Sequence, residues 1–195
     1  AAAVFNRAMT AFTGQEVEAI LGAYDFSAFA NVVDVGGGHG AFLAELLAAR
    51  PDLQGILYDL PHALEGARKL MAEAGVAERC AIVSGNFFLS APQGGDLYLL
   101  KRVIHDWDDE RAVVILKNCR DAIPDAGRLL VMEKVIPPGN TPSEATLFDI
   151  NMMVSAGGME RIEAEYRALL ARAGFVLTQV ISTACPLSLI EAVRT

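Results

Sequence analysis

Apolar segments typical of β-strands alternate along this chain with helix-like segments, and this alternation constrains the fold more than any other feature. Seven strands are expected, at residues 31–35, 54–59, 80–84, 96–102, 128–135, 175–181 and 187–193. Helices are expected at residues 41–50, 61–74, 108–122, 147–155 and 162–173. Alternation of this kind indicates an α/β fold, in which a parallel sheet carries helices on both faces.

The connection between the last two expected strands is too short for a parallel arrangement. It comprises only residues 182–186, whereas a parallel crossover needs a dozen or more residues. These two strands must therefore pair antiparallel. The sequence predicts a seven-stranded, mostly parallel sheet with one antiparallel strand near its edge.

Charge and composition restrict the partners of this protein. The net charge of −8 argues against nucleic acid, which calls for a basic face, and against an anionic membrane surface. No run of about 18 apolar residues is present, so no transmembrane helix is indicated. The three cysteines share no metal-ligand spacing. We therefore expect a cytoplasmic protein with reduced thiols and without a nucleic-acid or membrane partner.

A glycine-rich loop at residues 36–40 follows the first expected strand and precedes a helix. Glycine permits a sharp turn and close approach of a ligand, and the helix N-terminus presents oriented amides. Asp59, about 20 residues farther on, ends the next strand, where an acidic side chain can hold ribose hydroxyls. The pattern fits both a dinucleotide fingerprint and the loop of S-adenosylmethionine enzymes, so the cofactor stays open at this point.

A lone histidine, His105, follows the strand expected at residues 96–102, at the end where α/β sheets bind ligands. Histidine suits proton transfer near neutral pH, although an isolated histidine is more often structural. Glu133 interrupts an apolar run, so its carboxylate lies either in solvent at a strand end or in a buried pair. Glu160 alone is typical of an acid at the start of a helix. The acids after the histidine are expected to cap the next helix or to form its solvated first turn: Asp106, Asp108, Asp109 and Glu110.

Motifs along almost the whole chain match one protein family. They lie at residues 5–6 and 9, 33–40, 58–62, 85–88, 100–101, 105–107, 133 and 157–161. On these residues the chain resembles the catalytic domain of the plant-type small-molecule O-methyltransferases, which also occur in bacteria and act on caffeic acid, flavonoids, carotenoids and polyketides. The resemblance implies a Rossmann-like class I methyltransferase fold. It also implies S-adenosylmethionine as the cofactor, with S-adenosylhomocysteine as its product.

The resemblance assigns seven positions to this cofactor. They are Gly36 and Gly38 at its methionine part, Thr13 near its carboxylate, Lys101 partly through the backbone carbonyl, Asp59 at the ribose hydroxyls, and Asn86 and Phe87 at the adenine. The family often has serine at the position of Thr13 and more often has aspartate at that of Asn86. Asparagine keeps a carbonyl oxygen that can accept from the adenine amine.

The resemblance also implies the catalytic group and the acceptor. His105 would be the base that takes the proton of a hydroxyl on a small, aromatic or polyketide-like metabolite, and Glu133 and Glu160 would flank it. No metal is expected. Apolar side chains would wall the acceptor, since methionine thioethers adapt to flat rings. These are Met9, Phe148, Met152 and Met153.

The expected organisation is a helical lead-in at residues 1–30 and a catalytic, cofactor-binding domain at residues 31–195. Apolar residues in the lead-in, and the family's amino-terminal dimerisation domain, suggest that this chain is a carboxy-terminal fragment of a homodimeric protein. Two alternatives remain. A nicotinamide-dependent oxidoreductase would explain only the glycine loop and Asp59. A family member that binds the cofactor without transferring methyl is disfavoured by the intact His105, Glu133 and Glu160.

Overall fold

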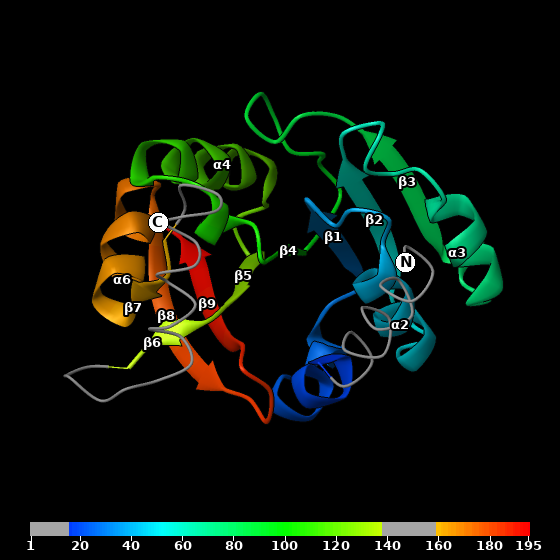
Figure 1. Ribbon diagram of the computed structural model, residues 1–195, viewed down its shortest axis with the longest axis horizontal. Helices are drawn as coiled ribbons and strands as arrows, with labels where there is room; N and C mark the ends of the chain where they lie inside the picture. Colours follow the sequence, from blue (N-terminus) through cyan, green and yellow to red (C-terminus); the bar gives the residue numbers. More distant parts are fainter. Residues whose placement is uncertain (1–15, 138–158) are drawn as a thin grey trace, which may run out of the picture.

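The computed structural model describes residues 16–137 and 159–195. Its centre is a seven-stranded sheet in the order β3-β2-β1-β4-β5-β9-β8 (Figure 1). The strands are β1 (Asn31–Val35), β2 (Gln54–Asp59), β3 (Cys80–Ser84), β4 (Leu97–Lys101), β5 (Arg128–Glu133), β8 (Phe175–Ser182) and β9 (Ser188–Arg194). Strands β1 to β5 run parallel, and β9 runs antiparallel to both β5 and β8. The predicted α/β sheet with one reversed strand near its edge is confirmed.

Helices connect most of the strands. They are residues 16–23, α2 (Ala41–Ala49), α3 (Ala67–Glu73), α4 (Asp109–Ala122), α6 (Glu163–Arg172) and the 3-10 helices η1 (Phe26–Ala28), η2 (Ala77–Arg79) and η3 (Ile104–Asp106). The helix expected at residues 61–74 begins only at Ala67, because Gly66 has a left-handed φ of 84° that an α-helix cannot include. The helix expected at residues 147–155 lies outside the described residues.

The strand expected at residues 128–135 is divided in the structure. Strand β5 ends at Glu133, and β6 (Val135–Ile136) instead pairs in parallel with β7 (Arg161–Ile162) as a separate two-stranded sheet. This pairing brings the chain that follows β5 beside the chain that precedes α6. Two segments far apart in sequence, around residues 133 and 160, are therefore neighbours.

Alternate residues of the central strands pack into two apolar cores on opposite faces of the sheet. Leu97 and Leu99 face the core shared with α2 and α3, whereas Tyr98 and Leu100 face the core shared with α4 and α6. All four side chains are fully buried. Helices α4 and α6 lie together against one part of the sheet in Figure 1. The prediction of helices on both faces is confirmed.

The topology determines where a ligand can bind. The carboxyl ends of the parallel strands meet at one edge of the sheet. From β1 the chain adds strands β2 and β3 on one side and then β4 and β5 on the other, so the strand order reverses between β1 and β4. Open α/β sheets bind ligands in the crevice that this reversal creates. Within residues 16–137 and 159–195, no helix is long and apolar enough to cross a membrane.

Candidate active site

The glycine loop after β1 is shaped for close approach on one side. Gly36 and Gly38 have φ values of 75° and 60°, a conformation that other residues rarely adopt. A Cβ atom on Gly36 would lie 2.8 Å from a methyl group of Val103, so the loop already packs tightly there. A Cβ atom on Gly38 would meet no atom within 4 Å among the described residues. The backbone at Gly38 is therefore open to a ligand.

Asp59 ties this loop to the end of β2. Its carboxylate accepts hydrogen bonds from the backbone amides of Gly38 at 2.8 Å and Leu60 at 2.6 Å. An ionised carboxylate offers about four acceptor sites, so these two bonds leave capacity for hydroxyl donors. The position expected for ribose recognition thus lies against the glycine loop.

A buried carboxylate, Asp34, lies beneath the same loop. Its side chain is 1% exposed, and neither oxygen has a hydrogen-bond partner among the described residues. Burial raises the pKa of Asp34 to about 7, although the charge of Lys101 opposes the shift. The residues that line the adjoining cavity are Asp34, Gly36, Gly37, His39, Ala41, Phe42 and Lys101. An unpaired buried carboxylate is costly, so this cavity is suited to a cationic group of a ligand.

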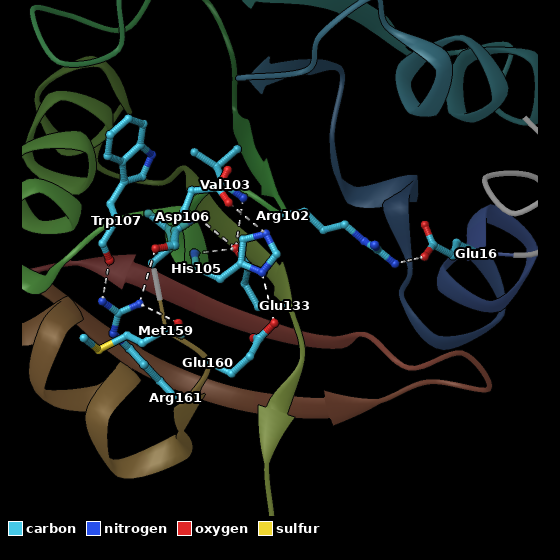
Figure 2. Close-up of polar contacts among 11 residues, drawn as sticks. Glu16, Arg102, Val103, His105, Asp106, Trp107, Glu133, Met159, Glu160 and Arg161 are labelled. Carbon is cyan, nitrogen blue, oxygen red and sulfur yellow. Dashed lines mark hydrogen bonds and ion pairs between the residues drawn. The ribbon is translucent and has the colours of Figure 1, made fainter. Parts of the chain in front are cut away.

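The end of β4 is tied to the helix at residues 16–23 through one glutamate. Glu16 Oε2 lies 2.8 Å from Lys101 Nζ, and Glu16 Oε1 accepts from Arg102 (Figure 2). Lys101 Nζ also lies 5.6 Å from the ring centroid of Phe42. Sequence reasoning missed Glu16, since nothing in its neighbourhood along the chain indicates these partners. The expected contact of the Lys101 carbonyl with the cofactor stays a prediction.

The loop after β3 places aromatic rings beside the glycine loop. Asn86 Oδ1 accepts from the backbone amide of Phe88 at 2.9 Å, so the asparagine organises its own turn. A Cβ atom on Gly36 would lie 3.4 Å from the ring of Phe87. The Phe87 ring packs edge-to-face on Phe88 and Trp107, at centroid distances of 5.0 and 6.2 Å. Phe87 therefore contributes a flat apolar surface at the position expected for adenine.

Glu133 anchors the turn that carries His105. It is fully buried, and its Oε1 accepts from the backbone amides of Val103, Ile104 and His105 at 3.0, 2.9 and 3.3 Å. Three amide donors at the start of η3 form a binding site for a carboxylate. Of the two alternatives that the sequence left open, burial in a pair is therefore correct.

The imidazole of His105 lies among three carboxylates (Figure 2). Nδ1 is 3.0 Å from Glu160 Oε1 and 3.6 Å from Glu133 Oε2. Nε2 is 3.6 Å from Asp106 Oδ1 on the other side of the ring. The structure thus brings together the three residues expected to form the catalytic group, with Nδ1 turned toward the buried glutamates.

The charges of this group are coupled. Burial lowers the pKa of His105, but the hydrogen bond to Glu160 and the charges of Glu133, Glu160 and Asp106 outweigh burial and raise it above its ordinary value. Burial raises the pKa of Glu133 to about 7, although His105 opposes the shift. Protons therefore leave the group in steps that belong to the group as a whole.

The same three residues have a spacing that a metal ion could bridge. One ligand atom from each of His105, Glu133 and Glu160 lies within 4.8 Å of the others. However, Glu133 Oε1 is occupied by backbone amides and His105 Nδ1 by Glu160. These hydrogen bonds favour an acid–base group, and the absence of a metal stays a prediction.

Several predicted residues lie outside the described residues. They are Thr13 of the cofactor site and Met9, Phe148, Met152 and Met153 of the acceptor pocket. Their roles stay predictions. Near the histidine, the described residues line a small crevice: Arg102, His105, Glu133, Lys134, Glu160 and Leu187.

A family model for the O-methyltransferase domain matches residues 1–176 of this 195-residue chain. The chain belongs to the O-methyltransferase family. The family predicted from the motifs is therefore confirmed, and so is the fold of this O-methyltransferase domain.

The O-methyltransferase domain has named relatives among bacterial O-methyltransferases. It is 45% identical over 189 residues to phenazine O-methyltransferase PhzM of Lysobacter antibioticus, covering 97% of this chain and 55% of that protein. It is 44% identical to the mitomycin biosynthesis 6-O-methyltransferase of Streptomyces lavendulae, covering 88% of this chain and 49% of that protein. The chain spans about half the length of these curated relatives.

A solved structure with both ligands is also similar. The O-methyltransferase NcsB1 from neocarzinostatin biosynthesis, in complex with S-adenosylhomocysteine and 1,4-dihydroxy-2-naphthoic acid, superposes with a TM-score of 0.86 at 35% identity. The match covers 100% of this chain and 58% of NcsB1.

Proposed function

We propose that this protein transfers a methyl group from S-adenosylmethionine to a hydroxyl of a small aromatic or polyketide-like metabolite, with His105 as the general base. The observation that carries the proposal is the position of His105 at the ligand-binding edge of the sheet, with Nδ1 held 3.0 Å from the buried Glu160. The naphthoic acid in the NcsB1 structure and the named phenazine and mitomycin enzymes support an aromatic acceptor.

The residues of the glycine loop fit this cofactor. The open backbone at Gly38 admits the methionine part, and the Asp34 carboxylate, which has no hydrogen-bond partner among the described residues, suits its ammonium group. Asp59 would accept from the ribose hydroxyls, and Phe87 would lie against the adenine. When bound there, S-adenosylmethionine supplies a methyl group made electrophilic by the attached sulfonium.

The reaction then needs a nucleophile, which the histidine group would provide. A phenol has a pKa near 10, so little of it is ionised at neutral pH. Neutral His105 would take the hydroxyl proton at Nε2, because Nδ1 faces Glu160. Glu160 would hold the ring in one orientation and stabilise the imidazolium, as a carboxylate does in catalytic triads. Help of this kind contributes roughly 100- to 10,000-fold.

Binding and turnover together test the proposal. Calorimetric titration of the full-length protein should detect S-adenosylhomocysteine and not NAD. Incubation with S-adenosylmethionine and a panel of phenolic and naphthoic acceptors should then give a methylated product by mass spectrometry. Binding of NAD alone would favour the oxidoreductase, which leaves the His105 cluster without a role. Binding without transfer to any acceptor would favour a cofactor-binding member that transfers no methyl.

The same family resemblance supports further proposals about the whole protein. Residues 31–195 would form the catalytic domain, residues 1–30 its helical lead-in, and an amino-terminal domain would join two subunits into a homodimer. Sedimentation of the full-length protein measures the last point directly. A monomer at micromolar concentration would contradict it.

Replacing Asp34 with asparagine should stabilise the ligand-free protein while weakening cofactor binding. The pKa of Asp34 is raised to about 7 in the folded state, so protonation of Asp34 stabilises the folded state. This stabilisation is fully present below about pH 4, near the ordinary pKa of aspartate, and is lost as the pH rises through 7. Asparagine cannot ionise, so the variant forms no buried charge as the pH rises. Its free energy of unfolding should therefore exceed that of the wild type by roughly 2–4 kcal/mol at pH 8 and by much less at pH 5.

Urea unfolding at the two pH values measures this difference, and calorimetry measures the affinity for S-adenosylhomocysteine. We expect about tenfold weaker binding, since the ammonium group loses a charged partner. Asp52→Asn is the control, because Asp52 is exposed. Equal stability at pH 8 together with unchanged affinity would contradict both parts.

A further inference from the structure

Arg161 is a fully buried arginine beside the proposed catalytic group, with 1% of its side chain exposed. Its Nε and Nη2 donate to Asp109 Oδ1 at 3.0 and 2.8 Å. Nη2 also donates to the carbonyl of Trp107 at 2.8 Å, and Nη1 to the carbonyls of Ile104 and Met159 at 3.3 and 3.4 Å. One guanidinium thus joins three parts of the chain: the turn η3, the start of α4 and the segment before β7. Figure 2 shows its bonds toward Trp107 and Met159.

These bonds bracket Glu160. On one side, the backbone amide of Met159 donates to the carbonyl of His105 at 2.8 Å. On the other side, Arg161 is fixed by its own side chain and by the pairing of β7 with β6. Glu160 lies between two residues that are each tied to η3 or to its flanks, so its carboxylate reaches His105 Nδ1 with little freedom.

The chemistry of these contacts requires arginine. The guanidinium is planar and carries five N–H donors in a fixed fork, whereas lysine offers one compact charge. The acceptors around Arg161 are one carboxylate and three carbonyls that lie in different directions. An ammonium group could satisfy only part of this set. A buried cation that loses its hydrogen-bond partners destabilises the folded state. Arg161 and its four acceptors therefore depend on one another.

We propose that Arg161 is a positioning residue, which holds Glu160 against His105 by clamping both residues' backbone segments together. The inference rests on the proposed function. The Arg161 side chain donates to Asp109 and to the carbonyls of Ile104 and Met159, so its effect on the pair is exerted through these backbone segments. Its loss should loosen the Glu160–His105 pair while leaving the glycine loop and Asp59 in place.

The test compares Arg161→Lys and Arg161→Met with Arg167→Met in the full-length protein. Arg167 lies on α6, the helix that follows β7, where it is exposed and pairs with Glu163, so it controls for loss of an arginine six positions from Arg161. The first readout is the imidazole titration of His105 by NMR with labelled histidine, with the resonance identified by its loss in His105→Gln. The second is kcat across pH with an acceptor from the panel, and the third is affinity for S-adenosylhomocysteine.

Both Arg161 variants should shift the His105 titration midpoint downward, because the hydrogen bond and charge of Glu160 that raise it are withdrawn. We expect kcat to fall about tenfold in Arg161→Lys and further in Arg161→Met, with S-adenosylhomocysteine affinity within twofold of the wild type. Arg167→Met should match the wild type in all three measurements. A folded Arg161→Lys protein with an unchanged titration midpoint and unchanged kcat would overturn the proposal.

A third variant, at the partner of Arg161, provides a test in case the Arg161 variants do not fold. Asp109→Asn keeps Arg161 and removes the charge of its one carboxylate partner, so it should shift the midpoint in the same direction by a smaller amount. If all three variants fail to fold, the role of Arg161 is purely structural and the positioning role is refuted. If the wild type methylates no acceptor, the proposed function fails, yet the titration midpoints still decide whether Arg161 positions Glu160.

Discussion

Replacing His105 with alanine should lower kcat for methyl transfer at pH 7 by at least ~100-fold. The acceptor hydroxyl then loses the imidazole: Glu133 Oε1 is engaged by backbone amides, Glu160 lies on the Nδ1 side, and only the carboxylate of Asp106, among the described groups around His105, stays on the Nε2 side. Affinity for S-adenosylhomocysteine should stay close to that of the wild type, because the glycine loop and Asp59 are held by other contacts. Single-turnover rates and calorimetry measure the two quantities.

The pH dependence provides a second readout of the same assignment. The base form of His105 is the neutral imidazole, and its pKa is raised above the ordinary value, so kcat should rise with pH through a midpoint above about 6.5. The positive charge of the protonated ring stabilises the folded state at low pH, and that contribution is lost as pH rises through the same midpoint. His62→Ala replaces an exposed histidine and serves as the control. Unchanged kcat in His105→Ala would remove His105 from the mechanism.

Much of the sheet could be predicted because each strand is bounded by clear signals. The strands at residues 31–35, 54–59 and 80–84 occur as expected, each as an apolar run that ends at a glycine or an acid. The reversed strand followed from a linker of five residues, from 182 to 186. The helix start at Ala67 was not predictable in this way, because the left-handed conformation of Gly66 depends on how the chain leaves β2.

The divided strand illustrates a different limit. Val135 continues the apolar pattern past Glu133, so composition favours one long strand. In the structure the buried carboxylate of Glu133 needs donors, and the amides of η3 provide them where β5 ends. The strand thus ends where the buried Glu133 carboxylate accepts these hydrogen bonds. No local sequence pattern shows which backbone amides will donate to it.

The candidate site shows the same division between local and distant signals. His105 was predictable from its place after a strand, but its partners are separated from it by 28 and 55 positions. The roles of Glu133 and Glu160 therefore came from the motif resemblance. The pairing of Asp109 with Arg161 was missed, since an acid in the first turn of a helix is usually solvated. Asp34 belongs to the loop pattern of S-adenosylmethionine enzymes in the sequence, but the pattern did not indicate that its carboxylate is buried without a hydrogen-bond partner among the described residues.

Replacing Asp59 with alanine should weaken S-adenosylhomocysteine binding by at least about 100-fold. Two hydroxyl hydrogen bonds to a charged acceptor contribute roughly 1.5–3 kcal/mol each, and each 1.4 kcal/mol is tenfold in affinity. Asp59 also fixes the amides of Gly38 and Leu60, so part of the loss would come from a looser loop. Asp59→Asn keeps one carbonyl acceptor and should fall between the two proteins. Calorimetric titration measures all three affinities.

Ribose recognition and loop fixation make different kinetic predictions for this variant. If Asp59 acts mainly by binding the ribose, the KM for S-adenosylmethionine should rise while kcat at saturating cofactor stays within about twofold, as for an interaction made equally in ground and transition states. If it acts mainly through the loop, kcat should also fall, because the loop packs against Val103 beside His105. Asp52→Ala, an exposed aspartate in the turn before β2, should change neither constant. Wild-type affinity in Asp59→Ala would remove this carboxylate from the cofactor site and leave the ribose to be held by other groups.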